Sequence, residues 1–278
     1  MVMAEMMTEI EHAGRVLVIA GSDSGGGAGI QADIKAIAAM GGYATTAITA
    51  ITAQNTLGVT AVHPVPLDIV IAQMTAVLDD IGTDAIKTGM LVNEAIVLAV
   101  ADMIEQRAPG RPFVLDPVMV ATSGDVLLDE GAEAAIRDRL LPLATLVTPN
   151  IPEAERLAGG KIEDIDGQIG AAEALIEMGA RAALVKGGHG SGSVARDVLV
   201  SARGMEIIER PRIETRHTHG TGCTLASAIA GLLARGYSLS DSVKHAGDYL
   251  YEAISRAPGY GSGHGPVDHM WMIREYSA

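Results

Sequence analysis

Short apolar runs alternate with stretches of helical periodicity along most of the chain. Residues 15–20, RVLVIA, form an apolar run ended by a glycine, which predicts a buried strand. Isoleucines then recur at helical spacing from Ile30 to Ile37, and predict a helix that ends at Gly41 and Gly42. Residues 43–52 alternate threonine with alanine and isoleucine, which predicts a second strand.

The alternation continues through the rest of the sequence. We expect further helices at residues 67–78, 95–106, 132–141, 171–178, 224–234 and 240–254. We expect further strands at residues 84–87, 113–115, 146–147 and 182–185, and a hairpin from residues 194–200 and 206–208. Strands that alternate with helices imply βαβ units. The predicted fold is therefore α/β, with a mostly parallel central sheet covered on both faces.

No internal repeat and no Pro- or Ser-rich linker divides the sequence. We therefore expect a disordered or weakly ordered lead at residues 1–14 and a single domain at residues 15–278. In sheets of this kind, ligands bind beyond the carboxyl ends of the strands. The segments that follow the predicted strands are therefore where chemistry is expected.

Charge and cysteine content argue against several classes of protein. The sequence carries 20 Lys and Arg against 34 Asp and Glu, a formal net charge of −14, which disfavours nucleic acid and anionic membranes as partners. Its one cysteine cannot form an internal disulfide. The acidic start lacks the features of a signal peptide, and no apolar run reaches the length of a membrane span. We expect a soluble cytoplasmic protein.

Residues 20–35, AGSDSGGGAGIQADIK, form a glycine-rich stretch between the first predicted strand and the first helix. Glycines let a ligand approach the backbone closely. The spacing differs from the G-x-G-x-x-G dinucleotide motif, and no acidic residue ends a clear second strand. The alternative is a turn that only packs the helix on the sheet. Such a turn needs fewer polar groups than this stretch carries, namely Ser22, Asp23, Gln31 and Asp33.

Polar residues also follow later predicted strands. Asp116 ends a strand because Pro117 cannot continue a central ladder, and its carboxylate could orient Mg²⁺ or its waters. Asn150 and Glu153 lie three apart at a helix start, where they could share one hydrated Mg²⁺ or form a helix cap. Taken alone, that spacing favours the cap. Lys186 ends a strand before a flexible turn, a suitable position for phosphate.

The stretch HTHGTGCT, residues 217–224, contains the cysteine and precedes an amphipathic helix. Gly220 to Cys223 would form the helix N-terminus, where free amides and the helix dipole favour negative charge. The same field lowers the pKa of a thiol. We expect no zinc site, because His217 and His219 have no further soft ligands. The remaining alternative is a buried, inert cysteine.

These stretches converge on one edge of the predicted sheet, because each follows a predicted strand or opens a helix. The segment TAITAQNT, residues 49–56, belongs to the same set. Its Gln54 is either an amide partner for a heteroaromatic ring or a solvated loop amide. Nucleotide phosphates, a metal ion and a small acceptor need such a convergence, whereas a mere scaffold does not.

Eight motifs run in order from Arg15 to His269: AGSDSGGGAGIQADIKA, ITAQNT, IKTGML, VLDPVM, TPNIPEAE, VKGGH, THGTGCTLASAIA and GHGPVDH. Together they resemble the hydroxymethylpyrimidine/phosphomethylpyrimidine kinase family of thiamine biosynthesis, in the ribokinase-like superfamily. The resemblance implies a three-layer α/β/α sandwich. It also implies transfer of the γ-phosphoryl group of ATP to 4-amino-5-hydroxymethyl-2-methylpyrimidine, and then to the resulting monophosphate.

The resemblance assigns substrate and nucleotide roles. Gln54 would hydrogen-bond the aminopyrimidine, and Asp33 would lie near the same pocket. The walls around the ring would be formed by Gly21, Thr52, Met90 and Val118. Mg²⁺ and ATP would be organised by Asp116, Asn150, Glu153 and Lys186, with Asp116 and Glu153 as metal ligands and Lys186 at the transferring phosphate. The family often has valine where this chain has Thr52, a small added polarity.

The resemblance also assigns the catalytic group. Many ribokinase-like enzymes place an aspartate base after this Gly-x-Gly turn, whereas this branch uses cysteine. Cys223 would accept the hydroxymethyl proton. The charge on the phosphoryl oxygens would be stabilised by the amides of Gly220, Thr221, Gly222 and Cys223. The family's commoner Pro-Ser is Ser24-Gly25 here, which removes no obvious catalytic group.

Three alternatives stay open at this point. A pyridoxal or pyridoxine kinase also phosphorylates a hydroxymethyl group on a heteroaromatic ring, although Gln54, Met90 and the glycine stretch favour the pyrimidine. A pyrimidine-binding protein without catalysis is the second, against which the intact candidate catalytic residues argue. A dinucleotide-dependent oxidoreductase is a distant third. By resemblance, the protein is expected to be a homodimer.

Overall fold

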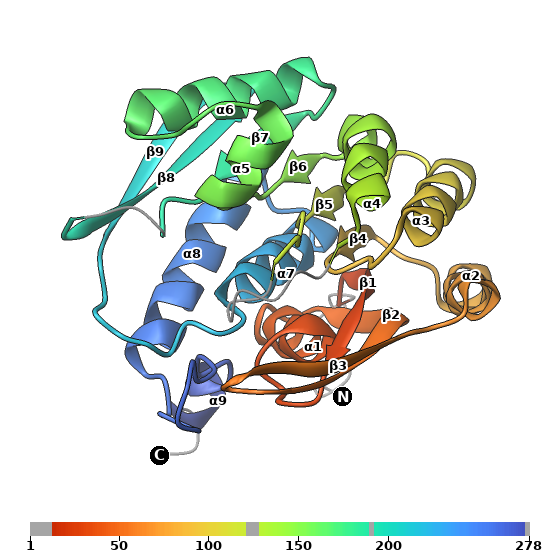
Figure 1. The fold of residues 1–278 in the computed structure, drawn as a ribbon, viewed down its shortest axis with the longest axis horizontal. Helices are drawn as coiled ribbons and strands as arrows, with labels where there is room; N and C mark the ends of the chain where they lie inside the picture. Colours follow the sequence, from red (N-terminus) through yellow and green to blue (C-terminus); the bar gives the residue numbers. More distant parts are fainter. Residues whose placement is uncertain (1–12, 121–127, 189–191, 276–278) are drawn as a thin grey trace, which may run out of the picture.

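A nine-stranded sheet is the centre of the computed structural model, which describes residues 13–120, 128–188 and 192–275. The strand order is β3-β2-β1-β4-β5-β6-β7-β8-β9 (Figure 1). The strands are β1 (Arg15–Asp23), β2 (Tyr43–Asn55), β3 (Gly58–Pro64), β4 (Ala85–Thr88), β5 (Phe113–Leu115), β6 (Leu146–Val147), β7 (Ala182–Val185), β8 (Val194–Ser201) and β9 (Gly204–Pro211). Residues 1–12 of the predicted lead, and His189 and Gly190 of the VKGGHG stretch, lie outside the described residues.

Helices cover both faces of this sheet. They are α1 (Gly29–Ala39), α2 (Leu67–Ala76), α3 (Glu94–Arg107), α4 (Glu130–Ala135), α5 (Ile151–Ala158), α6 (Ile165–Glu177), α7 (Thr221–Ala234), α8 (Leu239–Ser255) and the short α9 (Trp271–Glu275). One apolar core lies between the sheet and helices α2 to α6, and the other between the sheet and α1, α7 and α8 (Figure 1). The predicted three-layer α/β/α sandwich is confirmed.

The first strand shows why the sequence pattern works. Leu17 and Ile19 point into the core under α2 to α6, whereas Val16 and Val18 point into the core under α1 and α7. Side chains alternate between the two faces of a strand. A strand buried on both faces must therefore be apolar throughout, as residues 15–20 are.

The sheet is parallel from β2 to β7 and antiparallel at its edges. The predicted hairpin of β8 and β9 is confirmed. The edge strand β3 was not predicted, because none of its residues is buried and it therefore shows no apolar face. It is paired with β2 through its backbone, which the side-chain pattern does not report.

Helix ends differ most from the prediction. The expected helices at 67–78 and 132–141 end in π-helical turns, Val77–Ile81 and Ile136–Leu140. Helix α7 begins at Thr221, three residues before the expected start at 224, so Thr221 to Cys223 form its first turn. In the part of the chain that the structure describes, no helix is long and apolar enough to cross a membrane.

Candidate active site

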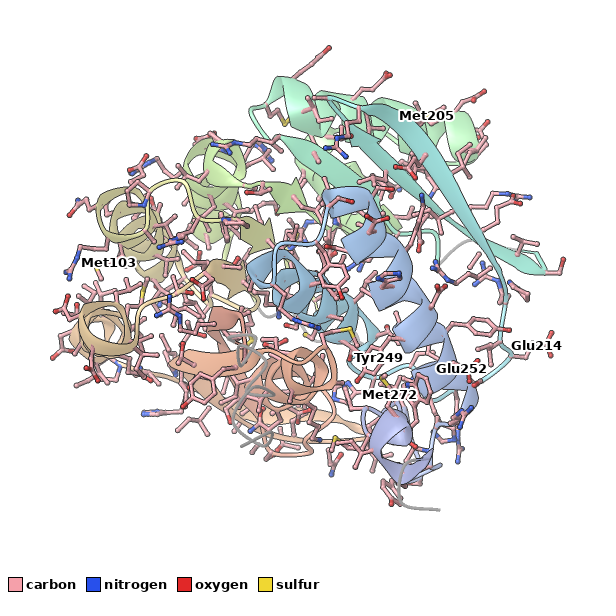
Figure 2. All side chains as sticks on the ribbon, turned by 180° about the vertical axis from the view of Figure 1, so that it is seen from behind. Met103, Met205, Glu214, Tyr249, Glu252 and Met272 are labelled. Atoms are coloured by element: carbon pink, nitrogen blue, oxygen red, sulfur yellow. The ribbon has the colours of Figure 1, made fainter. Side chains whose placement is uncertain are left out.

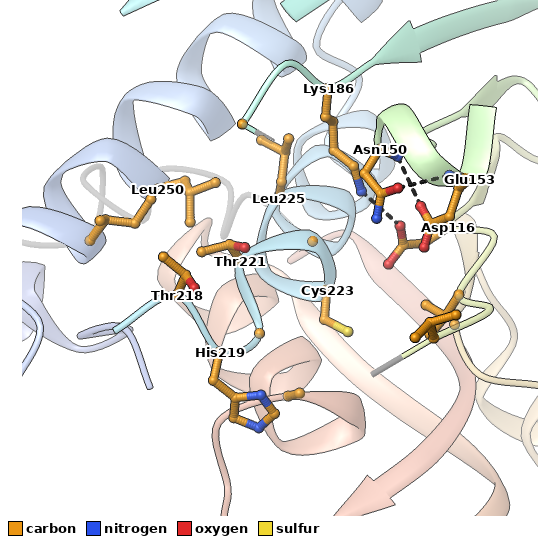
Figure 3. Close-up of a pocket in the computed structure, with 18 of the residues that line it drawn as sticks. Asp116, Asn150, Glu153, Lys186, Thr218, His219, Thr221, Cys223, Leu225 and Leu250 are labelled. Carbon is orange, nitrogen blue, oxygen red and sulfur yellow. Dashed lines mark hydrogen bonds and ion pairs between the residues drawn. The ribbon is translucent and has the colours of Figure 1, made fainter. Parts of the chain in front are cut away.

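A cavity of about 780 Å³ opens at the carboxyl ends of the central strands. It is lined by every site residue predicted from the sequence except Asp33. Those lining residues are Gly21, Thr52, Gln54, Met90, Asp116, Val118, Asn150, Glu153, Lys186, Gly220, Thr221, Gly222 and Cys223. Figure 3 shows Cys223 on the first turn of α7, with His219 on one side and the group around Lys186 and Asp116 on the other.

One part of the cavity wall is formed by Gly21, Met90 and Gln54. A Cβ atom on Gly21 would lie 2.4 Å from Cε of Met90, so glycine is what lets the methionine wall lie there. The Thr52 hydroxyl lies 3.0 Å from the Ser22 carbonyl oxygen and 3.1 Å from Oε1 of Gln54. Thr52 therefore touches the amide that the sequence assigns to the substrate.

The glycine stretch is organised by Asp23. Its carboxylate accepts hydrogen bonds from the amides of Gly25, Gly27 and Ala28 at 2.7 to 3.0 Å, and lies 2.8 Å from Nε2 of His219. Burial alone would raise the pKa of Asp23, but the hydrogen bonds from His219 and the loop amides outweigh burial and lower it. The ionised carboxylate therefore joins the glycine stretch to the start of α7. Sequence reasoning noted Asp23 as polar but missed His219 as its partner.

Another part of the cavity wall carries a cation and two carboxylates. Nζ of Lys186 lies 3.2 Å from Oδ1 of Asp116. Burial would lower the pKa of Lys186, but Asp116 and Glu153 outweigh burial and raise it, so the ammonium stays charged. Burial raises the pKa of Glu153 to about 7, against the opposing effect of Lys186.

The helix cap at α5 is confirmed. Oδ1 of Asn150 accepts the Glu153 amide at 2.9 Å, and Oε2 of Glu153 accepts the Asn150 amide at 2.9 Å. The cap satisfies two helix-start amides and fixes Glu153 at the cavity wall. Capping does not exclude a further role, because each carboxylate oxygen accepts more than one contact.

Among the described residues, no group of three or more His, Cys, Asp or Glu side chains could hold a metal ion. The carboxylates of Asp116 and Glu153 nevertheless suit Mg²⁺, which takes one or two carboxylates and completes its shell with waters and substrate phosphates. The donor chemistry at this part of the cavity wall therefore fits a magnesium–phosphate complex.

Cys223 is half-buried on the first turn of α7. Burial raises the pKa of its thiol to about 12; Lys87 opposes this, while Asp33 and Asp116 add to it. The predicted lowering of this pKa is wrong. The helix N-terminus favours the thiolate by only about 0.3–1 kcal/mol, which is less than the cost of burying a charge beside two carboxylates.

The prediction for Asp33 was a place near the substrate pocket. Asp33 is fully buried between α1 and the sheet and is not part of the cavity wall. Its Oδ1 lies 2.8 Å from Nζ of Lys87 and accepts a hydrogen bond of 2.7 Å from Ser227. Lys87, on β4, is fully buried as well. The buried position of Lys87 could have been suspected from the sequence, because the motif IKTGML places a lysine inside a buried strand.

Part of the cavity wall was missed from the sequence. It is formed by Arg210 of β9, by Arg212 just after that strand, and by Leu250, Tyr251 and Ile254 of α8. Arg212 donates to the Gly188 carbonyl oxygen at 2.7 Å and to that of Gly187 at 3.4 Å, so it holds the turn that follows Lys186. These residues carry no motif, because they lie on an ordinary helix and an edge strand.

Residues 23–268 match a family model described as phosphomethylpyrimidine kinase. The chain belongs to this family. It is 50% identical over 256 residues to a hydroxymethylpyrimidine/phosphomethylpyrimidine kinase of Rhizobium meliloti, covering 91% of this chain and 96% of that protein. It is 49% identical over 258 residues to the thiamine biosynthesis bifunctional protein ThiED of Geobacter sulfurreducens. That alignment covers 92% of this chain but only 52% of the bifunctional protein.

A solved structure from this superfamily is also similar. A Bacillus subtilis pyridoxal kinase in complex with ADP superposes with a TM-score of 0.87 at 35% identity, covering 93% of this chain and 98% of that one. The ribokinase-like fold is thereby confirmed. Sequence identity is higher to the pyrimidine kinase of Rhizobium meliloti than to this pyridoxal kinase.

Proposed function

We propose that this protein is an ATP-dependent kinase that phosphorylates 4-amino-5-hydroxymethyl-2-methylpyrimidine, and then its monophosphate to the diphosphate. Family membership supports the reaction class. The observation that carries the proposal is that one cavity is lined by Gln54, by Cys223 and by the ion pair of Lys186 and Asp116. Figure 3 shows Cys223, on the first turn of α7, between His219 and the group of Lys186 and Asp116.

We infer how the ring is recognised from the part of the cavity wall that contains Gln54. The Gln54 amide offers one donor and one acceptor, which matches the amino group and ring nitrogen of an aminopyrimidine. Met90 and Val118 would contact the ring faces. The hydroxymethyl group would then point toward Cys223.

We infer phosphoryl transfer from the part of the cavity wall that contains the start of α7 and Lys186. The first amides of a helix have no intrahelical partner and favour negative charge, so those of Gly222 and Cys223 would stabilise the transferring phosphoryl oxygens. The Thr221 amide donates to the Thr218 carbonyl oxygen at 3.3 Å, and would have to give up that contact to join them. Lys186 would contact the same group. We propose that Asp116 and Glu153 hold Mg²⁺, which would supply charge neutralisation at the ATP phosphates.

Cys223 works in this proposal as a protonated thiol that positions the acceptor hydroxyl. With its pKa at about 12, the resting thiol keeps its proton at neutral pH and cannot accept another. In a loose phosphoryl-transfer transition state, positioning and charge stabilisation supply most of the rate, and the hydroxyl proton can leave late, to an oxygen of the transferred phosphoryl group. This role replaces the thiolate base implied by the family resemblance.

Further properties are proposed on the same basis. We propose that residues 15–278 form one kinase domain, that the protein is a homodimer as the resemblance implies, and that it acts in the cytoplasm. Pyridoxal is the second candidate acceptor, because a pyridoxal kinase superposes closely on this chain. One ring contact rarely excludes a near isostere, so some turnover of pyridoxal is expected.

The test is ADP release with Mg-ATP and, separately, the hydroxymethylpyrimidine, its monophosphate and pyridoxal. We expect turnover of both pyrimidines at higher kcat/KM than pyridoxal. Cys223→Ala should lower kcat by about 100-fold, and Cys223→Ser, which keeps a hydrogen-bonding group in place, by no more than about tenfold.

Each other outcome points elsewhere. Turnover of pyridoxal alone would assign the protein to vitamin B6 phosphorylation. A Cys223→Ser variant as inactive as Cys223→Ala would mean that a thiolate base is required after all. Binding of the pyrimidine without any ADP release would favour a receptor without catalysis.

A further inference from the structure

A C-terminal segment contacts the chain just before and just after the first turn of α7. We call residues 265–269 the C-terminal strap. The Gly265 carbonyl oxygen accepts the amide of His219 at 3.1 Å. At the other end of the strap, Nε2 of His269 lies 2.9 Å from Oγ1 of Thr224. Between these two contacts lie residues 220–223, which are the N-cap Gly220 and the proposed phosphate-binding turn that follows it.

The direction of the His269 hydrogen bond can be worked out from the hydrogens. Oγ1 of Thr224 donates to the Gly220 carbonyl oxygen at 2.7 Å. A hydroxyl has only one hydrogen to donate. Thr224 must therefore accept from His269, whose ring carries its proton on Nε2. A continuous chain of donors runs from His269 through Thr224 to the carbonyl of Gly220.

Burial and charge keep this ring neutral. His269 is almost fully buried, and burial lowers its pKa to about 4. Lys35 and His219 act in the same direction, and Asp268 opposes them. At neutral pH the imidazole therefore has one N–H group, and that group donates to Oγ1 of Thr224.

The strap is itself fixed to the body of the protein. The Tyr249 hydroxyl donates to the carbonyl oxygen of His269 at 2.7 Å, and the Asp268 amide donates to the carbonyl oxygen of Ala253 at 2.8 Å. The Tyr249 hydroxyl and the Ala253 carbonyl oxygen both belong to α8. Figure 2 labels Tyr249 on α8, close to Met272 of α9. His269 is thus held in place independently of α7.

We propose that His269 is a positioning residue for phosphoryl transfer, which acts through Thr224 to fix the Gly220 carbonyl and the amides that follow it. Gly220 has the left-handed backbone conformation, with φ at 81°, and a Cβ atom there would lie 1.8 Å from the Gly27 carbonyl oxygen. Only glycine fits, and glycine alone holds its conformation poorly. The strap supplies the missing rigidity, on which stabilisation by preorganised amides depends.

This inference rests on the proposed function, and His269→Leu tests it. The variant loses the donor to Thr224. We expect kcat for the hydroxymethylpyrimidine to fall by about 100-fold and the affinity for Mg-AMP-PCP by about tenfold, with KM for the pyrimidine changed less than about threefold. KM for the pyrimidine is spared because its proposed contacts, Gln54 on β2 and Met90 just after β4, do not belong to α7 or the strap.

Two further variants separate positioning from general support of the fold. His269→Gln places an amide N–H near the position of Nε2, and should restore kcat and AMP-PCP affinity to within about fivefold of the parent protein. His264→Leu, the same change at an exposed histidine just before the strap, should leave both within about twofold.

The opposite results would overturn the proposal: an unchanged kcat in His269→Leu, or a His269→Gln variant that is no better than leucine. If His269→Leu does not fold, Thr224→Val and Thr224→Ser carry the same test, with loss expected in valine and retention in serine. If the parent protein turns over neither pyrimidine nor pyridoxal, the kinase proposal fails. The AMP-PCP affinities of the variants would still decide the role of the strap.

Discussion

At the scale of single residues, Cys223 shows how a local rule is overruled by its surroundings. The first turn of a helix favours a thiolate, and that is all the sequence around residue 223 reveals. Burial opposes it most, and the carboxylates of Asp33 on α1 and Asp116 just after β5 raise the pKa of the thiol further. Both lie about 100 residues or more away in the sequence. Their effect could not be predicted without the fold.

The raised pKa makes Cys223 slow to alkylate. A shift from the ordinary value of 9.0 to about 12 lowers the thiolate fraction at pH 8 by about 1000-fold. We expect iodoacetamide to react with the folded protein at least about 100-fold more slowly than with free cysteine. The chain has one cysteine, so mass spectrometry reports this site alone. The same chain unfolded in urea should react at the ordinary rate, and a fast reaction in the folded state would contradict the raised pKa.

Residues that follow strands were the ones that could be predicted. Asp116 and Lys186 directly follow the apolar strands β5 and β7, Gln54 lies at the end of β2, and all three line the cavity. His219 and His269 were not assigned because their roles depend on partners far along the chain. His219 meets Asp23 across 196 positions, and His269 meets Thr224 across 45.

At the scale of elements, the buried pair of Lys87 and Asp33 joins β4 to α1 beneath α7. Both side chains are fully buried, and Ser227 on α7 adds a hydrogen bond to Asp33. Oδ2 of Asp33 has no hydrogen-bond partner. Burial would lower the pKa of Lys87, but Asp33 outweighs burial and raises it, so the lysine remains a cation. The three elements therefore share one charged contact.

Removing either charge alone should be far more costly than removing both. Lys87→Met leaves the Asp33 carboxylate buried without its cation, which should lower the free energy of unfolding by about 3–5 kcal/mol. Lys87→Met with Asp33→Asn removes both charges and keeps an acceptor for Ser227. We expect this double variant to be destabilised by much less than the sum of the single variants. Urea unfolding of the four proteins measures this, and additive costs would show that the two charges do not interact.

The elements themselves were predicted where burial leaves a pattern in the sequence. Strands β1, β5 and β7 are apolar because both of their faces are covered. Strand β3 has no buried face, and the π-helical turns after α2 and α4 do not change the apolar spacing. Backbone pairing and hydrogen-bond register hold these parts, and neither is visible in a pattern of side chains.

At the scale of the whole molecule, the alternation of strands and helices predicted the layers but not the order of the strands. The structure places β1 between β2 and β4, so the glycine stretch at its end is flanked by strands on both sides. The C-terminal strap returns from α8 and pairs with the residues just before α7. Segments near both ends of the described chain thus meet at the start of α7, which explains why the motifs are spread over its length.

The strap also couples the stability of the molecule to pH. His269 has a pKa of about 4 when folded, against 6.5 for an ordinary histidine, so the unfolded chain binds a proton that the folded chain does not between these values. The free energy of unfolding should therefore fall as the pH is lowered from about 6.5 to about 4. The loss due to this residue is on the order of 3 kcal/mol.

His269→Gln cannot take up that proton, and its stability should decline less over the same range. Urea unfolding at pH 7.5 and pH 4.5 compares the two, with His264→Gln as the control that keeps the decline of the parent protein. Equal declines in all three proteins would mean that His269 is already able to take up a proton in the folded state, and that its contact with Thr224 does not hold it neutral.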